Sequence, residues 1–309
     1  MNDNHHHENL SNIRLALFLN LGFSAFEFVG GILTNSMAIL ADAVHDLGDG
    51  LALGIAFFLE KRSVSPGDHR YSYGYRRFSL LGALITAALL VFGSLYILSA
   101  AIPRLLRPEH SNAQGMLVFA LIGVAVNGFG ALRMMKSRGL NARMVTWHLV
   151  EDILGWLAVL VVSVVMLFRD IHILDPILSC LIALYVLYRV FVNLKKTLTV
   201  VMQGVPEEVD LLQIEKELKE LPGVRSVHHT HIWSMDGEQH VLSTHLVVDE
   251  QKELKDLVRL KETVREVVAR HEIAHSTVEI EFPGEVCRSQ TDSCYIGAEG
   301  KKAGETEEK

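Results

Sequence analysis

The chain has 309 residues, half of them hydrophobic, and its mean hydropathy of +0.26 is too high for an ordinary soluble domain. Its net charge of −7 gives no support for nucleic-acid binding, and three cysteines are too few for a disulfide scaffold. Charged residues concentrate in about the last hundred positions, so the composition indicates a membrane part followed by a soluble part.

The first two thirds of the chain contain apolar stretches long enough to cross a lipid bilayer. The opening segment, MNDNHHHENL, lacks the pattern of a cleaved signal peptide, and we expect residues 1–12 to form a His-containing tail. Six apolar stretches follow, each near the ~20 residues that cross a ~30 Å hydrocarbon core. They run roughly over 13–33, 36–59, 78–102, 114–135, 144–168 and 172–193. The sequence therefore predicts an all-α six-helix membrane domain over 13–203.

Two of these stretches carry ionisable residues. The second contains Asp42, His45, Asp46 and Asp49, and the fifth contains His148, Glu151 and Asp152. Membrane helices tolerate such residues when they face the bundle interior or a wet cavity. Amphipathic surface helices are the alternative, but apolar flanks such as ILGWLAVLVVSVVML favour helices that cross the membrane.

One spacing occurs in both polar stretches. His45 and Asp49 are four positions apart, and so are His148 and Asp152. A four-residue step on an α-helix brings two side chains onto one face, about one turn apart. Two such helices side by side would offer four nitrogen and oxygen ligands, the number that tetrahedral Zn²⁺ takes. Because ionisable groups are costly inside a bilayer, these pairs predict a functional metal site.

The distribution of lysine and arginine predicts the orientation in the membrane. The connections 60–77 and 133–143 and the end of the sixth helix are basic. The opposite side has only Arg104, Arg107 and Arg169. Both termini of this multi-pass protein are therefore expected in the cytoplasm, across a bacterial-type inner membrane.

A second domain follows Gln203. EEVDLLQIEKELKEL and ELKDLVRLKETVREVVARH have the apolar spacing of amphipathic helices, while VRSVHHTHIW, HVLSTHLVVD and STVEIEF are typical of strands. The order α-β-β-α-β predicts a ferredoxin-like, two-layer α+β domain over 204–284. The polar residues 285–309 predict a disordered tail.

Several longer motifs occur in the order known from one protein family. They begin with Asn20, Glu27 and NSMAILADAVHDLGDGLALG, and continue with HRYSYGYRRFSLLGAL, LNARMVTWHLVEDILGW, MQGVP and VHHTHIW. Over about residues 10–283 the chain resembles the cation diffusion facilitator family of metal transporters, in its zinc-transporting type.

This resemblance implies a homodimer that exports Zn²⁺ or a related ion from the cytoplasm in exchange for protons. It assigns the transport site, between the second and fifth helices, to four residues: His45, Asp49, His148 and Asp152. Members with Asp or Asn at position 45 are associated with other metals, so His45 indicates zinc, with cadmium or cobalt as further substrates. The resemblance also implies a regulatory metal in a cytoplasmic, metal-sensing domain.

The ligand chemistry agrees with this interpretation but leaves alternatives open. Two carboxylates neutralise Zn²⁺ and two neutral imidazoles complete its shell, whereas Mg²⁺ and Ca²⁺ prefer oxygen ligands. Protons compete with metal for the same side chains, which is a basis for antiport. A Co²⁺, Cd²⁺, Ni²⁺ or Fe²⁺ exporter and a passive metal channel are the alternatives. A metalloenzyme would need an open ligand position and a general base, so we do not expect an enzyme.

Histidines also cluster in the C-terminal domain. His228 and His245 fall on the first two predicted strands, and Glu281 ends the third. Adjacent strands lie ~4.8 Å apart, so these three side chains can converge on a second metal ion. Strand alternation places His228 on one face of the sheet and both His229 and His231 on the other. We expect His231 to be packed, and His240 and His271 to be solvated.

Three further groups carry weaker metal-binding hypotheses. The resemblance implies a possible loop site at Asp68 and His69. Tyrosines here occupy positions that are histidine in some members of the family, so solvated loop residues are the favoured interpretation. Asp42 either supports the membrane site or bonds to a neighbouring helix. Soft and borderline ligands near the two termini could capture zinc or could simply be solvated; these are His5, His6, His7, Cys287 and Cys294.

Overall fold

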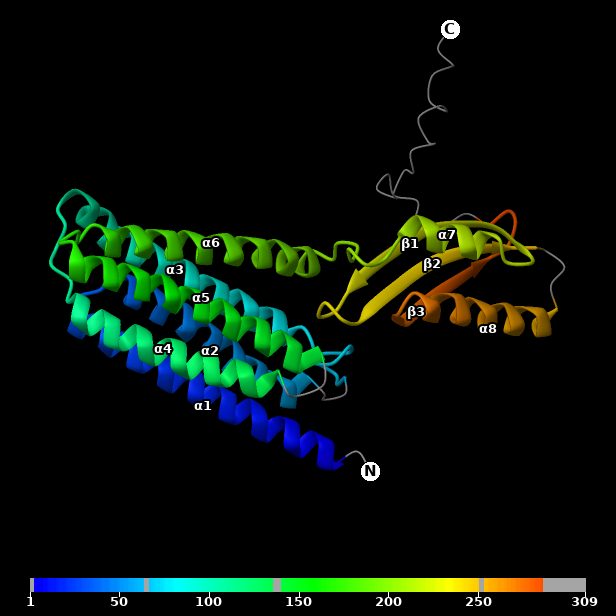
Figure 1. Cartoon of the computed structure of the whole chain (residues 1–309). Helices are drawn as coiled ribbons and strands as arrows, with labels where there is room; N and C mark the ends of the chain where they lie inside the picture. Colours follow the sequence, from blue (N-terminus) through cyan, green and yellow to red (C-terminus); the bar gives the residue numbers. More distant parts are fainter. Residues whose placement is uncertain (1–2, 64–66, 136–139, 250–252, 286–309) are drawn as a thin grey trace, which may run out of the picture. The chain divides into compact units, whose positions relative to one another are not determined.

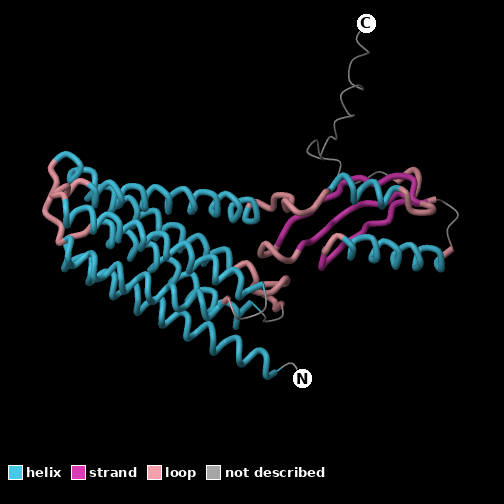
Figure 2. Tube along the Cα trace, in the orientation of Figure 1, coloured by secondary structure: helices cyan, strands magenta, loops and turns pink. Residues whose placement is uncertain are grey.

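The computed structural model describes residues 3–63, 67–135, 140–249 and 253–285, without the side chains of some helical residues (Figures 1 and 2). The chain divides into two compact units, residues 1–195 and residues 196–309. The first unit is helical, and the second contains a β-sheet with two helices.

The first unit confirms the predicted six-helix bundle, and Figure 1 shows its helices running side by side. The helices are α1 (Asp3–Thr34), α2 (Met37–Ser63), α3 (Phe78–Leu106), α4 (Ala113–Met134), α5 (Leu140–Phe168) and α6 (Leu174–Val201). Helix α1 begins at Asp3, inside the segment expected to be a tail. Asn35 separates α1 from α2 with a φ of +51°, a left-handed conformation that asparagine tolerates better than most residues.

Four helical segments of the described chain are long and apolar enough to cross a membrane. They are Phe78–Leu106, Ala113–Arg133, Leu149–Phe168 and Leu174–Val201. Large apolar side chains on these helices face outward: Phe92, Phe129 and Leu181 are 71%, 69% and 60% exposed. Such extensive apolar exposure is costly in water and marks a surface that lipid covers.

Small residues allow the helices to approach closely in the interior of the bundle. Trp156 of α5 is fully buried and packs in a cluster with Ile39 of α2 and Met116 of α4. A Cβ atom at Gly123 of α4 would lie 2.2 Å from the Trp156 ring. Only glycine at position 123 therefore permits this separation between α4 and α5.

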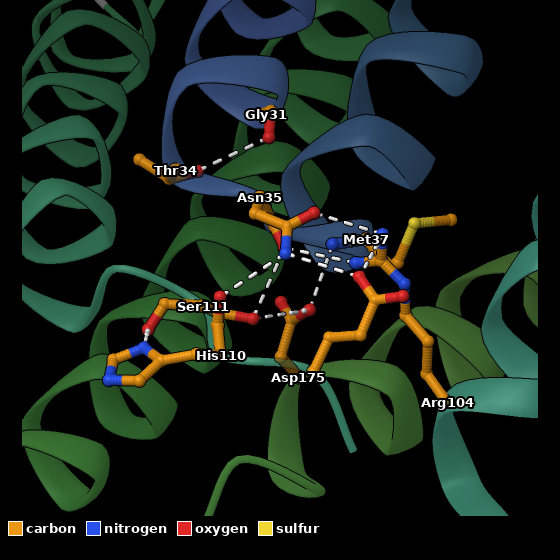
Figure 3. Close-up of polar contacts among 9 residues, drawn as sticks. Gly31, Thr34, Asn35, Met37, Arg104, His110, Ser111 and Asp175 are labelled. Atoms are coloured by element: carbon orange, nitrogen blue, oxygen red, sulfur yellow. Dashed lines mark hydrogen bonds and ion pairs between the residues drawn. The ribbon is translucent and has the colours of Figure 1, made fainter. Parts of the chain in front are cut away.

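One buried carboxylate joins several helix ends, as Figure 3 shows. Asp175, in the first turn of α6, is fully buried. It accepts hydrogen bonds from the Ser36 hydroxyl at 2.5 Å and the Met37 backbone N–H at 2.8 Å, and from the Ser111 hydroxyl at 3.4 Å. The N–H groups at a helix start have no partner within the helix, so Asp175 of α6 supplies one for α2.

A second set of contacts closes the same end of the bundle. Arg104, in the last turn of α3, donates to the backbone oxygen and the side-chain oxygen of Asn35 at 3.1 and 2.9 Å (Figure 3). Its guanidinium also lies 2.8 Å from the Glu109 carboxylate. The connections α1–α2 and α3–α4 are thus held together by side chains.

The second unit confirms the predicted α-β-β-α-β order. Its elements are α7 (Leu211–Lys219), β1 (Val224–Ser234), β2 (His240–Val248), α8 (Leu254–Arg270) and β3 (Ile273–Glu281). The sheet order is β1-β2-β3, with β1 antiparallel and β3 parallel to β2. Parallel pairing of β2 and β3 requires a crossover, and α8 provides it.

A single hydrophobic core holds this sheet and its helices together. Even-numbered residues of β2, Leu242, Leu246 and Val248, pack against Ile214 and Leu218 of α7 and against four apolar residues of α8. Those four are Leu260, Val264, Val267 and Val268. Odd-numbered residues of β2, including His245, must face the other side of the sheet.

The Asp175 network yields a prediction about stability. Asp175→Ala should lower the stability of the bundle by on the order of 3 kcal/mol, because buried donors lose a charged acceptor. Asp175→Asn keeps one acceptor oxygen and should cost less. The measurement is the thermal midpoint of detergent-solubilised protein, followed by size-exclusion chromatography. Equal midpoints for all three proteins would contradict a stabilising role.

Candidate functional site

A polar cluster lies where α2 faces α5. His45 and Asp46 of α2 and Asp152 of α5 each offer a ligand atom, and these atoms all lie within 4.8 Å of one another. Asp46 and Asp152 are buried, at 4% and 8% exposure, and His45 is half-buried. An imidazole and two carboxylates at this separation are a group that can hold a divalent cation.

The other two predicted ligands also belong to these helices. The His45 Nε2 atom lies 3.8 Å from Asp49 Oδ2, so the four-residue spacing brings this pair together as expected. His148 lies on α5, one turn before Asp152, but its side chain is outside the described residues. Three of the four assigned residues can therefore be located by their side chains.

Asp46 is the residue that the spacing argument missed. The His-x-x-x-Asp motif pairs His45 with Asp49, whereas Asp46 follows His45 directly in the sequence. Asp42 and Asp46 form a second four-residue pair that overlaps the first one. This spacing places both carboxylates on one face of α2 and is the sequence signal for Asp46. Sequence spacing alone could not rank Asp46 against Asp49, because both lie within one helical turn of His45.

More carboxyl groups surround this cluster. Asp42 is buried one turn before Asp46 on α2. Glu27 of α1 is fully buried, and Asp46, Asp42 and Asp152 lie close enough to interact with it electrostatically. Three helices therefore direct acidic side chains into one apolar region, where their charge must be offset by cations or by bound protons.

Gly155 of α5 lies beside the cluster. A Cβ atom at Gly155 of α5 would lie 3.5 Å from Asp42 Oδ1, at ordinary contact distance. Gly155 is three residues after Asp152, on the side of α5 that faces α2. The short distance shows that α5 approaches the acidic residues of α2 at this position.

The adjacent acidic residue of α5 has a different environment. Glu151 lies 2.9 Å from the guanidinium of Arg189 on α6, and the Tyr185 hydroxyl donates a hydrogen bond to Glu151. Arg189 also donates to the Tyr185 oxygen at 2.7 Å. Successive residues on a helix point about 100° apart, so Glu151 pairs with α6 while Asp152 faces α2.

The sheet of the second unit brings together the three residues predicted there. His228 and His245 are direct partners across β1 and β2. The Glu281 carboxylate lies between them, 2.7 Å from His245 Nδ1 and 3.2 Å from His228 Nε2. Ligand atoms of all three residues lie within 4.8 Å of one another, and His245 and Glu281 are buried. The set suits a borderline divalent cation such as Zn²⁺.

A β-bulge interrupts the alternation of side chains that was expected for β1. The register shifts between His228 and His231, and His229 has a φ of +54°. The His229 ring consequently lies 4.9 Å from the His245 ring and 4.6 Å from the His231 ring, measured between centroids. Burial, and then the imidazoles of His231, His245 and His228, lower the pKa of His229 below its ordinary value.

Three histidine environments differ from the predictions. His231 is exposed rather than packed, because the bulge turns it out of the regular alternation. His240 is buried at the first residue of β2, and His271 lies 3.3 Å from Glu217, so neither is simply solvated. The hydrogen bond from Gln213 and the nearby His271 imidazole hold the pKa of Glu217 below its usual range.

The loop between α2 and α3 gives Asp68 a structural role. Its carboxylate accepts hydrogen bonds from the backbone N–H groups of Arg70 and Tyr71, both at 2.8 Å, and from the Tyr75 hydroxyl at 2.7 Å. These bonds, that from Tyr75 foremost, lower the pKa of Asp68. Among the residues that the structure describes, Asp68 and the exposed His69 belong to no metal-ligand group.

The possible metal ligands near the two termini lie outside the described structure. The side chains of His5, His6 and His7 are not described, and neither are Cys287, Cys294 and the rest of the predicted tail from residue 286 onward. The remaining cysteine, Cys180 of α6, is a free thiol.

Two family models match the chain. The cation efflux transmembrane domain matches residues 13–202, and the cytoplasmic domain of cation efflux proteins matches residues 206–282. Together with the helical bundle and the α+β domain, these matches define an integral membrane protein of the cation efflux class. The chain belongs to the cation diffusion facilitator family, a family of transporters.

Bacterial relatives cover nearly the whole chain. A protein of Bacillus velezensis named cadmium, cobalt and zinc/H(+)-K(+) antiporter is 31% identical over 95% of this chain and 98% of its own. The metal cation efflux system protein CzcD of Cupriavidus metallidurans is 34% identical over 89% of this chain and 87% of its own. The zinc transporter ZitB of Escherichia coli is 30% identical over 89% and 88%.

Proposed function

We propose that this protein is a homodimeric exporter that moves Zn²⁺ across the membrane in exchange for protons. The observation that carries the proposal is the buried cluster of imidazole and carboxylate groups between α2 and α5. Zn²⁺ is the substrate, and its ligands are His45, Asp49, His148 and Asp152. Asp46, whose ligand atom lies within 4.8 Å of those of His45 and Asp152, is the competing candidate for a ligand position.

The composition of the cluster supports zinc as the ion. Nitrogen and carboxylate ligands together favour Zn²⁺ and its neighbours Co²⁺, Ni²⁺ and Cd²⁺, whereas Mg²⁺ and Ca²⁺ favour oxygen alone. The names of the relatives include zinc, cadmium and cobalt. Exporters of Cd²⁺, Co²⁺, Ni²⁺ or Fe²⁺ remain the second candidates, because a set of this composition ranks these ions only by modest differences in affinity.

Proton exchange follows from the cost of burying these side chains. Carboxylates inside the bundle need a cation or protons to offset their charge, and histidine changes its charge near physiological pH. Metal binding requires deprotonated ligands, so binding of the ion releases protons and rebinding of protons releases the ion. A relative named as an H(+)-K(+) antiporter supports proton coupling and adds potassium as a possible counter-ion. A passive metal channel is the alternative that lacks this exchange.

The second unit is proposed as the cytoplasmic, dimer-forming and metal-sensing domain. Its match to the cytoplasmic domain of cation efflux proteins supports the first two roles. The convergence of His228, His245 and Glu281 supports regulatory Zn²⁺ binding. The basic connections between helices support placing both termini in the cytoplasm.

The first functional prediction separates the possible ligands on α2. Asp49→Ala and Asp152→Ala should each abolish zinc flux into proteoliposomes, because each removes a charge-neutralising ligand. Asp46→Asn should retain measurable flux if Asp49 is the ligand. Glu151→Gln is the matched control, since Glu151 pairs with α6, and it should retain flux as well. Loss of flux in Asp46→Asn with near-normal flux in Asp49→Ala would transfer the ligand position to Asp46.

The second functional prediction concerns proton coupling. Zinc uptake into proteoliposomes should be accompanied by alkalinisation of the lumen, reported by an enclosed pH dye, because each ion displaces protons outward. An acidic lumen should raise zinc uptake, and a protonophore should remove this increase. Asp152→Ala provides the background signal. Zinc movement without proton movement in either potassium-containing or potassium-free buffer would favour the channel.

The third functional prediction concerns the second domain. The fragment 206–285 should fold alone, because its core is drawn entirely from its own residues. Zinc should raise its melting temperature, since a ligand that binds only the folded state stabilises that state. His228→Ala combined with His245→Ala should remove most of the increase, while His271→Ala should preserve it. An unchanged zinc effect in the double variant would refute the assigned ligands.

A further inference from the structure

A third cluster of metal-ligating side chains lies at the end of the bundle where Asp175 is found. His110 belongs to the connection between α3 and α4, while Asp170 and His172 belong to the connection between α5 and α6. Ligand atoms of the three residues all lie within 4.8 Å of one another. Residues about sixty positions apart in the sequence are therefore brought together by the ends of four helices.

The geometry of the cluster is compact. His172 Nε2 lies 2.7 Å from Asp170 Oδ1, and the His110 and His172 rings are 4.1 Å apart between centroids. Two ligands of a tetrahedral Zn²⁺ stand ~3.4 Å apart when each is ~2.1 Å from the ion. Small rotations of the side chains would bring the three ligand atoms to these positions.

The two histidines present nitrogen atoms that can bind a cation. His110 Nδ1 lies 3.2 Å from the Ser111 backbone oxygen (Figure 3). A carbonyl oxygen can only accept, so Nδ1 carries the proton and His110 Nε2 keeps its lone pair. Both ring nitrogens of His172 are buried and lack a partner with hydrogen-bond geometry, although the carboxylate of Asp170 is near. A bound cation would satisfy His172 and neutralise Asp170.

The surrounding structure fixes the chain on either side of the two histidines. Ser111, next to His110, bonds to Asp175, and Asp175 is three residues after His172 (Figure 3). The same connection is fixed by Asn112, which caps α4 by accepting from the Gly115 backbone N–H at 3.0 Å. The nearby basic residue Arg104 is occupied by Glu109 and Asn35. Fixed ligands pay less ordering entropy when they bind an ion.

We propose that His110, Asp170 and His172 form a binding site for a borderline divalent cation such as Zn²⁺ or Co²⁺. Two imidazoles and one carboxylate supply three ligands, and water supplies the fourth, because His110 and Asp170 are exposed. An ion at this site links the α3–α4 connection to the α5–α6 connection and stabilises this end of the bundle. The site shares no residue with the α2–α5 cluster, so the inference does not depend on the transport mechanism.

The test uses the full-length protein in detergent, with the other two clusters disabled by Asp152→Ala, His228→Ala and His245→Ala. Zn²⁺ bound per chain is measured by equilibrium dialysis and elemental analysis. Adding Asp170→Asn should weaken the remaining binding by on the order of tenfold or more, because it removes a ligand. Asp170 is 89% exposed, so this change leaves the packing intact. Adding His172→Ala should remove about one ion per chain and the stabilisation by Zn²⁺ seen in thermal melts.

Glu109→Gln is the matched control. It removes a negative charge from the connection that carries His110, yet Glu109 pairs with Arg104 and belongs to no ligand group in the described residues. It should leave Zn²⁺ binding unchanged. Equal Zn²⁺ content in the background protein and in both site variants would overturn the proposal. Equal losses of Zn²⁺ binding in Glu109→Gln and Asp170→Asn would also overturn it, because they would indicate general electrostatic attraction. Full displacement of Zn²⁺ by equimolar Mg²⁺ would overturn it as well.

Discussion

Burial of acidic side chains in an apolar bundle is the constraint on which the membrane domain depends. Asp46 and Asp152 converge with His45, and Asp42 and Glu27 are buried beside them. Such a group is unstable in hydrocarbon unless cations or protons offset its charge. The proposed exchange of one for the other would meet this requirement, and cation transport agrees with membership in a family of cation efflux transporters.

Close helix packing and a rigid bundle end keep this cluster in position. Gly123 admits the ring of Trp156, one turn after Asp152, and Gly155 lies beside Asp42 where α5 approaches α2. At the end of the bundle, Asp175 of α6 caps the start of α2, the helix that carries His45 and Asp46. The polar groups that hold the bundle together are thus connected through α2 to those that can bind metal.

Metal-ligating residues recur in three separate places, each built from two or three chain segments. The α2–α5 cluster combines two helices, the sheet cluster combines β1 and β2 with β3, and the third combines two short connections. All three pair imidazole with carboxylate, which suits ions of the zinc type rather than Mg²⁺. The three sets share no residue, so each can be removed by substitution without altering the ligands of the others.

The sequence by itself determined the six helices, the α-β-β-α-β order and the spacing of His45 with Asp49, because these follow from local periodicity along one element. It also placed His228, His245 and Glu281 on strands that could converge. Only the tertiary structure decided that Asp46 approaches Asp152, that a bulge turns His229 toward His245, and that His110 meets His172. These proximities depend on helix rotation, on an irregular strand register and on loops meeting across the bundle, none of which a local pattern specifies.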